Sequence, residues 1–121
     1  MGDKVSVTVR RERGVSIAEV NGDIDMSTVA GLRERLIELA DSGHPLIIDL
    51  NRVTFIDSTG LGVLVRAARH ADLHGGSLHA VCSRPQTRKL LWLTGVDRRI
   101  PLTATVDAAL TLLAASHDEP G

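Results

Sequence analysis

Apolar residues occupy every second position from Val5 to Val9, and polar residues fill the positions between them. A period of two is typical of a strand that has one face in solvent. Residues 11–14 then form a polar turn that ends in glycine, and residues 15–20 form a second apolar run. The two runs predict an antiparallel hairpin that ends at residues 21–23.

Helical spacing replaces this alternation in four later segments. Ser27 or Thr28 can cap a first helix, which Gly43 ends before Pro45. A second helix follows residues 57–60 and stops at the glycine pair 75–76, and a third runs from Pro85 to a glycine at position 95. Residues 106–113 carry the i, i+3, i+4, i+7 pattern of a last helix.

Short apolar runs lie between the helices and predict strands at 46–50, at 77–82 and, more weakly, at 100–102. Strand–helix–strand units require right-handed crossovers and a largely parallel sheet. We therefore expect an α/β domain with a mixed, mostly parallel sheet of four to five strands, about four helices and an N-terminal hairpin. One domain covers residues 1–121, with its core at about 5–113 and a frayed tail at 116–121.

Composition narrows the choice of function. Hydrophobic residues make up 43% of the chain, but with one Trp and one Phe the core must be aliphatic, and little is left for stacking on bases or cofactors. The charge of 14 basic against 15 acidic residues gives no electrostatic reason to bind nucleic acid or an acidic membrane. No apolar stretch approaches the ~20 residues of a membrane span, which predicts a cytoplasmic protein. With Cys82 alone, no internal disulfide and no cysteine metal cluster can form, and we expect no metal and no cofactor.

The most informative segment is Asp57-Ser58-Thr59-Gly60, between a buried strand and a helix. The start of a helix presents N–H groups without intrahelical partners, so it favours an anion. A phosphate on Ser58 would gain ~0.3–1 kcal/mol there. Gly60 and Gly62 would leave room for a large partner to approach the hydroxyl. Taken alone, the four residues also fit an ordinary N-cap.

The sequence around residues 57–60 contains further motifs. The pattern glycine, acid, aliphatic, aspartate occurs at residues 22–25, and an aliphatic strand ends in Asp49-Leu50. The run Phe55-Ile-Asp-Ser-Thr-Gly-Leu-Gly-Val-Leu64 follows, with a glycine pair at 75–76 and Leu-Thr-Gly-Val at 93–96. With these motifs, the chain resembles the STAS-domain family of bacterial anti-sigma factor antagonists from about Val5 to Leu113.

The resemblance implies a protein that regulates transcription by partner switching, that is, by a change in which proteins bind each other. The unmodified antagonist binds an anti-sigma factor that is a serine kinase and so frees a sigma factor; phosphorylation breaks the complex, and a PP2C-type phosphatase reverses it. By position the phosphoserine is Ser58, with Thr59 as a weaker acceptor. Asp25 is the first candidate for contact with the kinase and Asp23 the second. The predicted partner-binding surface also includes the helix start, namely Asp57, Ser58, Thr59, Gly60, Leu61 and Gly62. A weak homodimer is left open.

Other functions were weighed against this switch. A STAS scaffold or a regulatory subunit of a signalling or lipid-transport complex is the main alternative, but it would need no hydroxyl at position 58. An enzyme with Ser58 as a hydrolytic nucleophile is disfavoured because the glycine-x-serine-x-glycine elbow is missing, although His44, His70 or His79 could be near in space.

Three further features have a structural explanation. His70 and His74 have the i, i+4 spacing of a metal pair, but no third ligand is evident, so a solvated helix face is preferred. Gly60-x-Gly62 lacks the phosphate-loop lysine, so only weak nucleotide binding is left open. Trp92 is expected in core or rim packing, with an exposed contact to a partner as the alternative, and Cys82 is expected in a buried strand.

Overall fold

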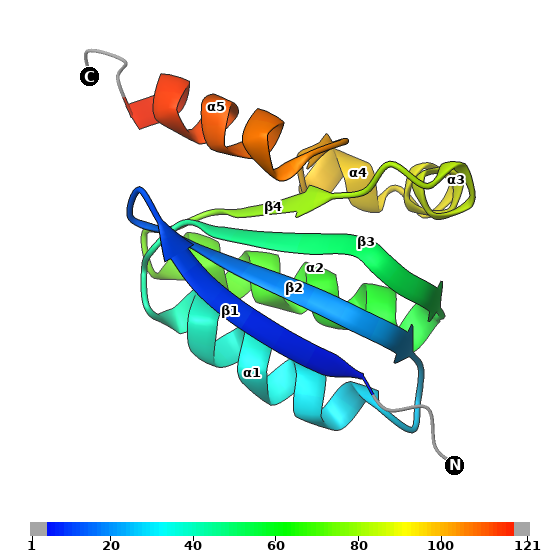
Figure 1. The fold of residues 1–121 in the computed structure, drawn as a ribbon. Coiled ribbons are helices and arrows are strands. Elements are labelled where there is room, and N and C mark those ends of the chain that lie inside the picture. Colours follow the sequence, from blue (N-terminus) through cyan, green and yellow to red (C-terminus); the bar gives the residue numbers. More distant parts are fainter. Residues whose placement is uncertain (1–4, 118–121) are drawn as a thin grey trace.

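The computed structural model describes residues 5–117, and Figure 1 shows one sheet with helices on both sides. The strands are β1 (Ser6–Glu12), β2 (Val15–Ile24), β3 (Leu46–Ile56), β4 (Leu78–Val81) and β5 (Leu102–Thr103). The helices are α1 (Val29–Asp41), α2 (Ser58–Leu73), α3 (Pro85–Thr94), α4 (Val96–Arg99) and α5 (Val106–His117). The strand order is β1-β2-β3-β4-β5.

The sheet has the predicted mixed topology. β1 and β2 pair antiparallel, and the three pairs from β2 to β5 are parallel. The predicted fold class is therefore confirmed, but several boundaries change. β2 and β3 continue to Ile24 and Ile56, and α4 is an additional short helix. The predicted frayed tail is wrong at residues 116–117, which belong to α5, and its remainder lies outside the described residues.

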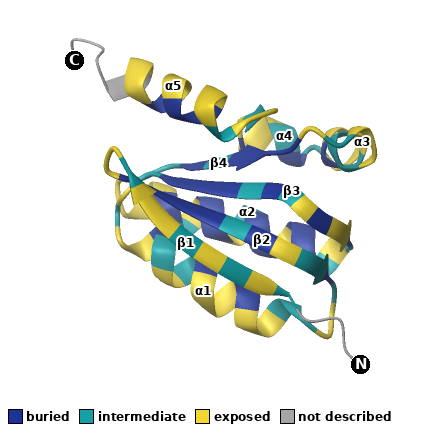
Figure 2. Cartoon of the chain, viewed as in Figure 1, coloured by how far each residue is buried: buried dark blue, intermediate teal, exposed yellow. Residues whose placement is uncertain are grey.

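The core has two parts, one on each side of the sheet. α1 and α2 cover one face, and α5 lies on the other face near β4 (Figure 1). Ile17, Ile47 and Val81 pack with Leu110 and Leu113 on the α5 side. The larger cluster faces α1 and α2, and Figure 2 shows its buried positions along β2, β3 and α2. Both clusters are aliphatic, as the composition predicts, apart from the buried Cys82.

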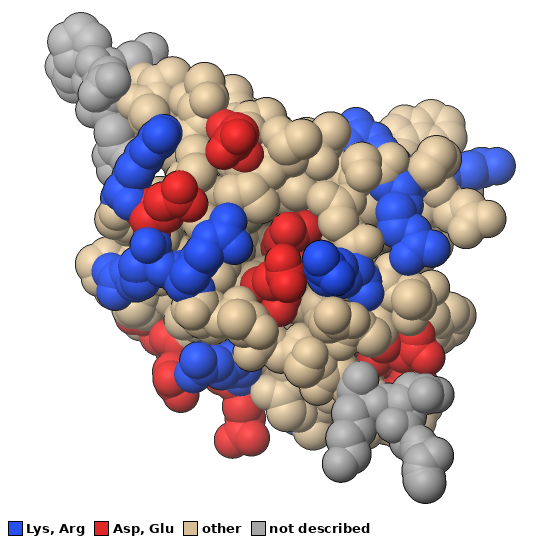
Figure 3. Space-filling view, in the orientation of Figure 1, with Lys and Arg blue, Asp and Glu red and all other residues tan. Residues whose placement is uncertain are grey.

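Basic and acidic side chains are interspersed on the side of the molecule shown in Figure 3. Two ion pairs between neighbouring sheet residues belong to this pattern, Arg10–Glu12 at 3.8 Å and Arg52–Glu19 at 3.7 Å. Such exposed pairs add little to stability, typically ~0–1 kcal/mol. This side therefore offers no large region of one sign to a charged partner.

His79 has a buried ring nitrogen on the α5 side of the sheet. It pairs with Ile47 across β3 and β4 and lines a small cavity together with Leu113 of α5. Within the described residues its Nδ1 has no hydrogen-bond partner, and burial lowers the pKa of the imidazole. Protonation of His79 is therefore easier in the unfolded chain than in the folded one.

We expect the free energy of unfolding to contain a pH-dependent contribution from His79. Because its folded pKa is lowered, this contribution is fully present above the unfolded pKa of about 6.5 and is lost as pH falls below that value. Urea unfolding of the wild type and of His79→Gln, each at pH 7.5 and 5.0, measures it. The other histidines are common to both proteins, so the difference between them isolates His79. An equal loss of stability in both proteins would contradict the prediction.

Candidate functional site

Ser58 is exposed at the point where β3 passes into α2, and it is the first residue of that helix. Its neighbour Asp57 donates its backbone N–H to the carbonyl of Ile24 at 3.1 Å. This bond ties the start of α2 to the end of β2. The Ser58 hydroxyl thus lies at the C-terminal ends of β2 and β3, where these two strands and α2 are held together.

Asp57 is the N-cap of α2. Its Oδ1 accepts the backbone N–H groups of Thr59 at 3.0 Å and Gly60 at 3.1 Å, and it also accepts the Thr59 hydroxyl. The Thr59 hydroxyl, followed by the Gly60 N–H, lowers the pKa of Asp57, so the cap is ionised at neutral pH. The carboxylate therefore already occupies two of the N–H groups expected to favour an anion, as in the ordinary N-cap that the sequence also allows.

The loop between β2 and α1 brings Asp25 to the same place. Its Oδ1 accepts the hydroxyl of Ser27 at 2.7 Å and the Ser27 N–H at 2.9 Å, and these bonds lower the pKa of Asp25. The charge of Asp57 acts in the opposite direction, because the two carboxylates lie near each other. Asp23 is half-buried and accepts the hydroxyl of Thr54. Two ionised carboxylates, Asp25 and Asp57, therefore lie beside Ser58, and Asp23 and Asp25 are both half-buried.

Two predicted contact residues are buried instead. Gly60 has no room for a side chain, because a Cβ there would lie 2.6 Å from the Ile24 side chain and 2.7 Å from that of Ile56. Leu61 is only 7% exposed. Direct contact of Gly60 and Leu61 with a partner is therefore wrong, and Gly60 instead allows α2 to pack closely on β2 and β3. Gly62 is exposed, with open space where its Cβ would be.

Alanine at these two glycines should have opposite effects on stability. Gly60→Ala is expected to lower the free energy of unfolding by about 1–3 kcal/mol, because the added methyl overpacks the core. Gly62→Ala is expected to raise it by up to about 1 kcal/mol, since alanine is the better helix former and meets nothing. Urea unfolding of both variants provides the test, and a neutral Gly60→Ala would refute the packing role.

Met26, in the loop between β2 and α1, and Phe55, next to the last residue of β3, are exposed apolar side chains. Met26 is 77% exposed and Phe55 is 53% exposed. Phe55 is exposed because the register between β2 and β3 shifts next to it. Gly22 pairs with Val53 but Asp23 pairs with Phe55, so Thr54 is an extra residue in β3. A bulge of this kind changes which side chains face the core. Exposed aromatic and methionine side chains are typical of protein interfaces.

His44, His70, His74 and His79 are not placed to activate Ser58. His79 pairs with Ile47, and His44 precedes the start of β3, whereas Ser58 follows the end of that 11-residue strand. His70 and His74 lie in the last turn and at the C-cap of α2. The suggestion that His44, His70 or His79 lies near the hydroxyl is therefore wrong.

The histidine pair of α2 is held by a carboxylate. Nδ1 of His70 lies 2.8 Å from Oδ1 of Asp41, and Nδ1 of His74 lies 3.4 Å from the same oxygen. Asp41 thus joins α1 to α2 at the end far from Ser58. Within the part of the chain that the structure describes, no group of three or more metal-ligating side chains is arranged to hold an ion.

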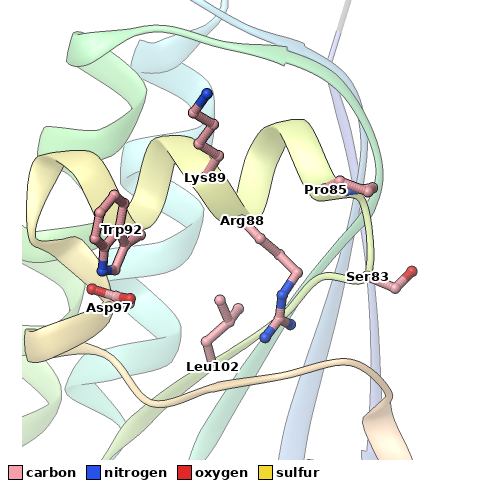
Figure 4. A pocket seen from close by; sticks show the side chains of 7 residues that line it. All are labelled: Ser83, Pro85, Arg88, Lys89, Trp92, Asp97 and Leu102. Atoms are coloured by element: carbon pink, nitrogen blue, oxygen red, sulfur yellow. The ribbon is translucent and has the colours of Figure 1, made fainter.

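Trp92 is 64% exposed, so the expectation of core or rim packing is wrong. It borders a groove of about 550 Å³ between α3 and the segment that leads into β5. Figure 4 shows the indole next to the carboxylate of Asp97, with the Arg88 side chain and Leu102 farther along the groove. Arg88 is fixed there by a bond from Nη1 to the carbonyl of Cys82 at 2.7 Å.

The fold and the motif at the start of α2 agree with a known family. The family model described as the STAS domain matches residues 6–109. This chain belongs to the STAS domain family. The resemblance seen in the sequence is thereby confirmed.

Curated relatives of this STAS domain share its length as well as its sequence. The anti-sigma-F factor antagonist RsfB of Mycobacterium tuberculosis is 36% identical over 111 residues, which cover 90% of this chain and 89% of that protein. The anti-sigma-B factor antagonist of Bacillus subtilis is 33% identical over 100 residues, covering 83% and 92%. Among solved structures, an anti-sigma factor antagonist from Mycobacterium paratuberculosis has a TM-score of 0.82 at 35% identity and covers 89% of this chain and 92% of its own.

None of the helices within residues 5–117 is long and apolar enough to cross a membrane.

Proposed function

We propose that this STAS domain is an anti-sigma factor antagonist that is switched by phosphorylation of Ser58. The unphosphorylated protein binds an anti-sigma factor, which is a serine kinase, and so releases a sigma factor. The observation that carries the proposal is the exposed Ser58 hydroxyl at a rigid junction of β3 and α2. The names of the relatives, which are regulatory proteins, support the same function.

The surroundings of the two hydroxyls favour Ser58 over Thr59 as the phosphoacceptor. Thr59 is half-buried, and its hydroxyl donates to the Asp57 cap. Phosphorylation of the Thr59 hydroxyl would break its hydrogen bond to Asp57 and weaken the start of α2. The Ser58 hydroxyl is exposed, and no hydrogen bond within residues 5–117 engages it. A kinase can therefore reach Ser58 without disturbing the helix.

The surface around Ser58 combines charge and apolar area. Asp25 and Asp57 make it acidic, and Met26 and Phe55 give it exposed apolar side chains. We assign these four residues, with Ser58, as the contact surface for the kinase. Asp23, which is bonded to Thr54, has a lesser share. A partner of this composition presents a basic side chain to Asp25 and an apolar pocket to Phe55.

Phosphorylation changes this surface without refolding. A phosphate adds about −1.5 to −2 charges beside two carboxylates. If the partner covers Ser58, an unpaired charge in the closed interface costs ~2–5 kcal/mol, and binding falls by about 30-fold to several thousand-fold. The field at the start of α2 favours the phosphate, while Asp25 and Asp57 oppose it, so the two effects on the fold offset each other. A PP2C-type phosphatase restores the hydroxyl in the cytoplasm, and the protein itself catalyses no reaction.

Intact mass after incubation with the cognate anti-sigma kinase and ATP tests the proposal. We expect a gain of one phosphate in the wild type and in Thr59→Ala, and none in Ser58→Ala. Size-exclusion chromatography of the same samples should show the complex before phosphorylation and the separated proteins afterwards. A phosphate that persists in Ser58→Ala, or a phosphorylated protein that stays bound, would overturn the proposal.

A further inference from the structure

The solvent face of α2 begins at Ser58 and continues along the whole helix. At about 100° per residue, positions 58, 62, 65, 66, 69 and 73 fall within an arc of about 100°, while the buried residues of α2 occupy the opposite side. The face is about 22 Å long from Ser58 to Leu73. A partner that buries a standard ~800 Å² per side needs more surface than the first turn of α2 offers, and the solvent face of α2 is one direction in which it can extend.

The second half of this face carries basic side chains, and Glu34, Glu38 and Asp41 of α1 line the neighbouring groove beside Arg66. A groove of about 460 Å³ lies between α2 and α4 and is lined by Arg66 and Arg69 of α2 and by Arg99 of α4. In the described part of the chain, none of the three guanidinium groups lies within 4.0 Å of a carboxylate. Asp72, the acid of α2, is exposed and pairs with none of them. Three unpaired cations from two helices therefore line one groove.

Apolar surface borders these cations. Leu73 is 75% exposed at the end of the groove, and Val65 is half-buried in its wall. Gly62, the groove residue closest to Ser58, has open space around its Cβ position, so packing within the domain does not require a glycine there. The groove thus joins the Ser58 surface, and it combines cations with apolar contacts as an amphipathic protein segment requires.

We infer that the α2–α4 groove binds an acidic segment of the same anti-sigma factor that covers Ser58. This inference rests on the proposed function. The segment places carboxylates against Arg66, Arg69 and Arg99 and an apolar side chain against Leu73. The interface then has an acidic end at Asp25 and Asp57 and a basic end at the arginines. Opposite charges at the two ends allow the partner to dock in one direction along α2 and place its active site over Ser58.

Charge reversal in the groove tests the inference. Arg66→Glu/Arg69→Glu is compared with Arg10→Glu/Arg11→Glu, which changes the charge equally at two exposed positions of β1. Binding of the full chain to its anti-sigma factor is measured by calorimetry at low and high salt. We expect the groove variant to raise the dissociation constant by about 30-fold at 50 mM NaCl. At 500 mM NaCl the increase should be less than about 5-fold, because salt screens exposed charges. The β1 variant should bind within about 2-fold of the wild type at both concentrations.

The outcomes separate this inference from the proposed function. If wild-type protein neither binds the kinase nor gains a phosphate, the proposed function fails. If the wild type does both but the groove variant binds equally well, or loses affinity equally at both salt concentrations, only the groove inference fails. A groove variant that binds normally yet no longer retains inorganic phosphate or a nucleic acid oligomer held by the wild type would assign the arginines to another anion and would also overturn it.

Discussion

Ser58→Glu is expected to weaken the complex with the anti-sigma factor by about 10- to 100-fold and to leave the fold intact. The glutamate brings one negative charge to a surface that already carries Asp25 and Asp57. A phosphate dianion without a partner in a closed interface costs ~2–5 kcal/mol. The cost of the single charge of a glutamate should lie at the lower end of that range. Calorimetric titration of the kinase with each variant gives the ratio of dissociation constants.

Ser58→Gln is the matched control, because it has the size of glutamate without its charge. We expect Ser58→Gln to bind within about 5-fold of the wild type, and Ser58→Ala to bind normally but accept no phosphate. If Ser58→Gln is as weak as Ser58→Glu, crowding rather than charge separates the proteins. The electrostatic explanation of the switch would then be wrong.

The fold of Ser58→Glu should be unaffected because Ser58 is exposed and its hydroxyl makes no hydrogen bond within residues 5–117. Acids in the first turn of a helix gain ~0.3–1 kcal/mol from its dipole, and the neighbouring Asp57 reduces this gain. Urea unfolding should therefore place the variant within about 0.5 kcal/mol of the wild type. A larger loss of stability would mean that lost binding reflects unfolding.

Local sequence signals determined the order and type of most elements. The alternation from Val5 to Val9 and the helical spacing after Val29 are direct consequences of which side chains face the core. Gly95, with φ of 80°, ends α3 as the pattern predicted, because a left-handed residue suits a helix end. These features depend on neighbours within a few residues, so they can be identified without the tertiary structure.

Features that depend on contacts between distant segments could not be identified in this way. The bulge at Thr54 is a relation between β2 and β3, and it exposes Phe55 where a strand pattern gives no warning. The close approach of Ile24 to Gly60 likewise joins two segments far apart in sequence. For this reason the sequence motif predicts a contact residue at Gly60, whose role in the structure is packing. Trp92 is exposed because Leu91 supplies the core contact of α3.

The candidate site was found from sequence only in part, for the same reason. The sequence motifs identified Ser58 and the acidic loop, because the family resemblance implies that both belong to one site. Residues 57–60 also fitted an ordinary N-cap, and this is the role that Asp57 has, because its carboxylate occupies the N–H groups of Thr59 and Gly60. This occupation limits how much the helix start can stabilise a phosphate, and it assigns the effect of phosphorylation mainly to the interface.

Phe55→Ala should weaken binding to the anti-sigma factor by about 10- to 100-fold, the second of the two largest effects expected. A Phe side chain that is half exposed in the free protein gains its burial energy only when a partner covers it, and aromatic side chains at the centre of interfaces often contribute 2 kcal/mol or more. Leu112→Ala is the matched control, because Leu112 is 49% exposed on α5, which lies on the other side of the sheet from α2. Calorimetry should show normal binding for that variant.

Salt distinguishes the role of Phe55 from that of the arginines. Burial of an aromatic ring is not screened by ions, so the loss in Phe55→Ala should be nearly equal at 50 and 500 mM NaCl, whereas losses from exposed charges shrink. If Phe55→Ala binds like the wild type, the partner does not cover the end of β3, and the contact surface must be limited to α2 and the acidic loop. If its loss shrinks with salt, the ring acts through neighbouring charges, because Phe55 pairs with Asp23 in the sheet.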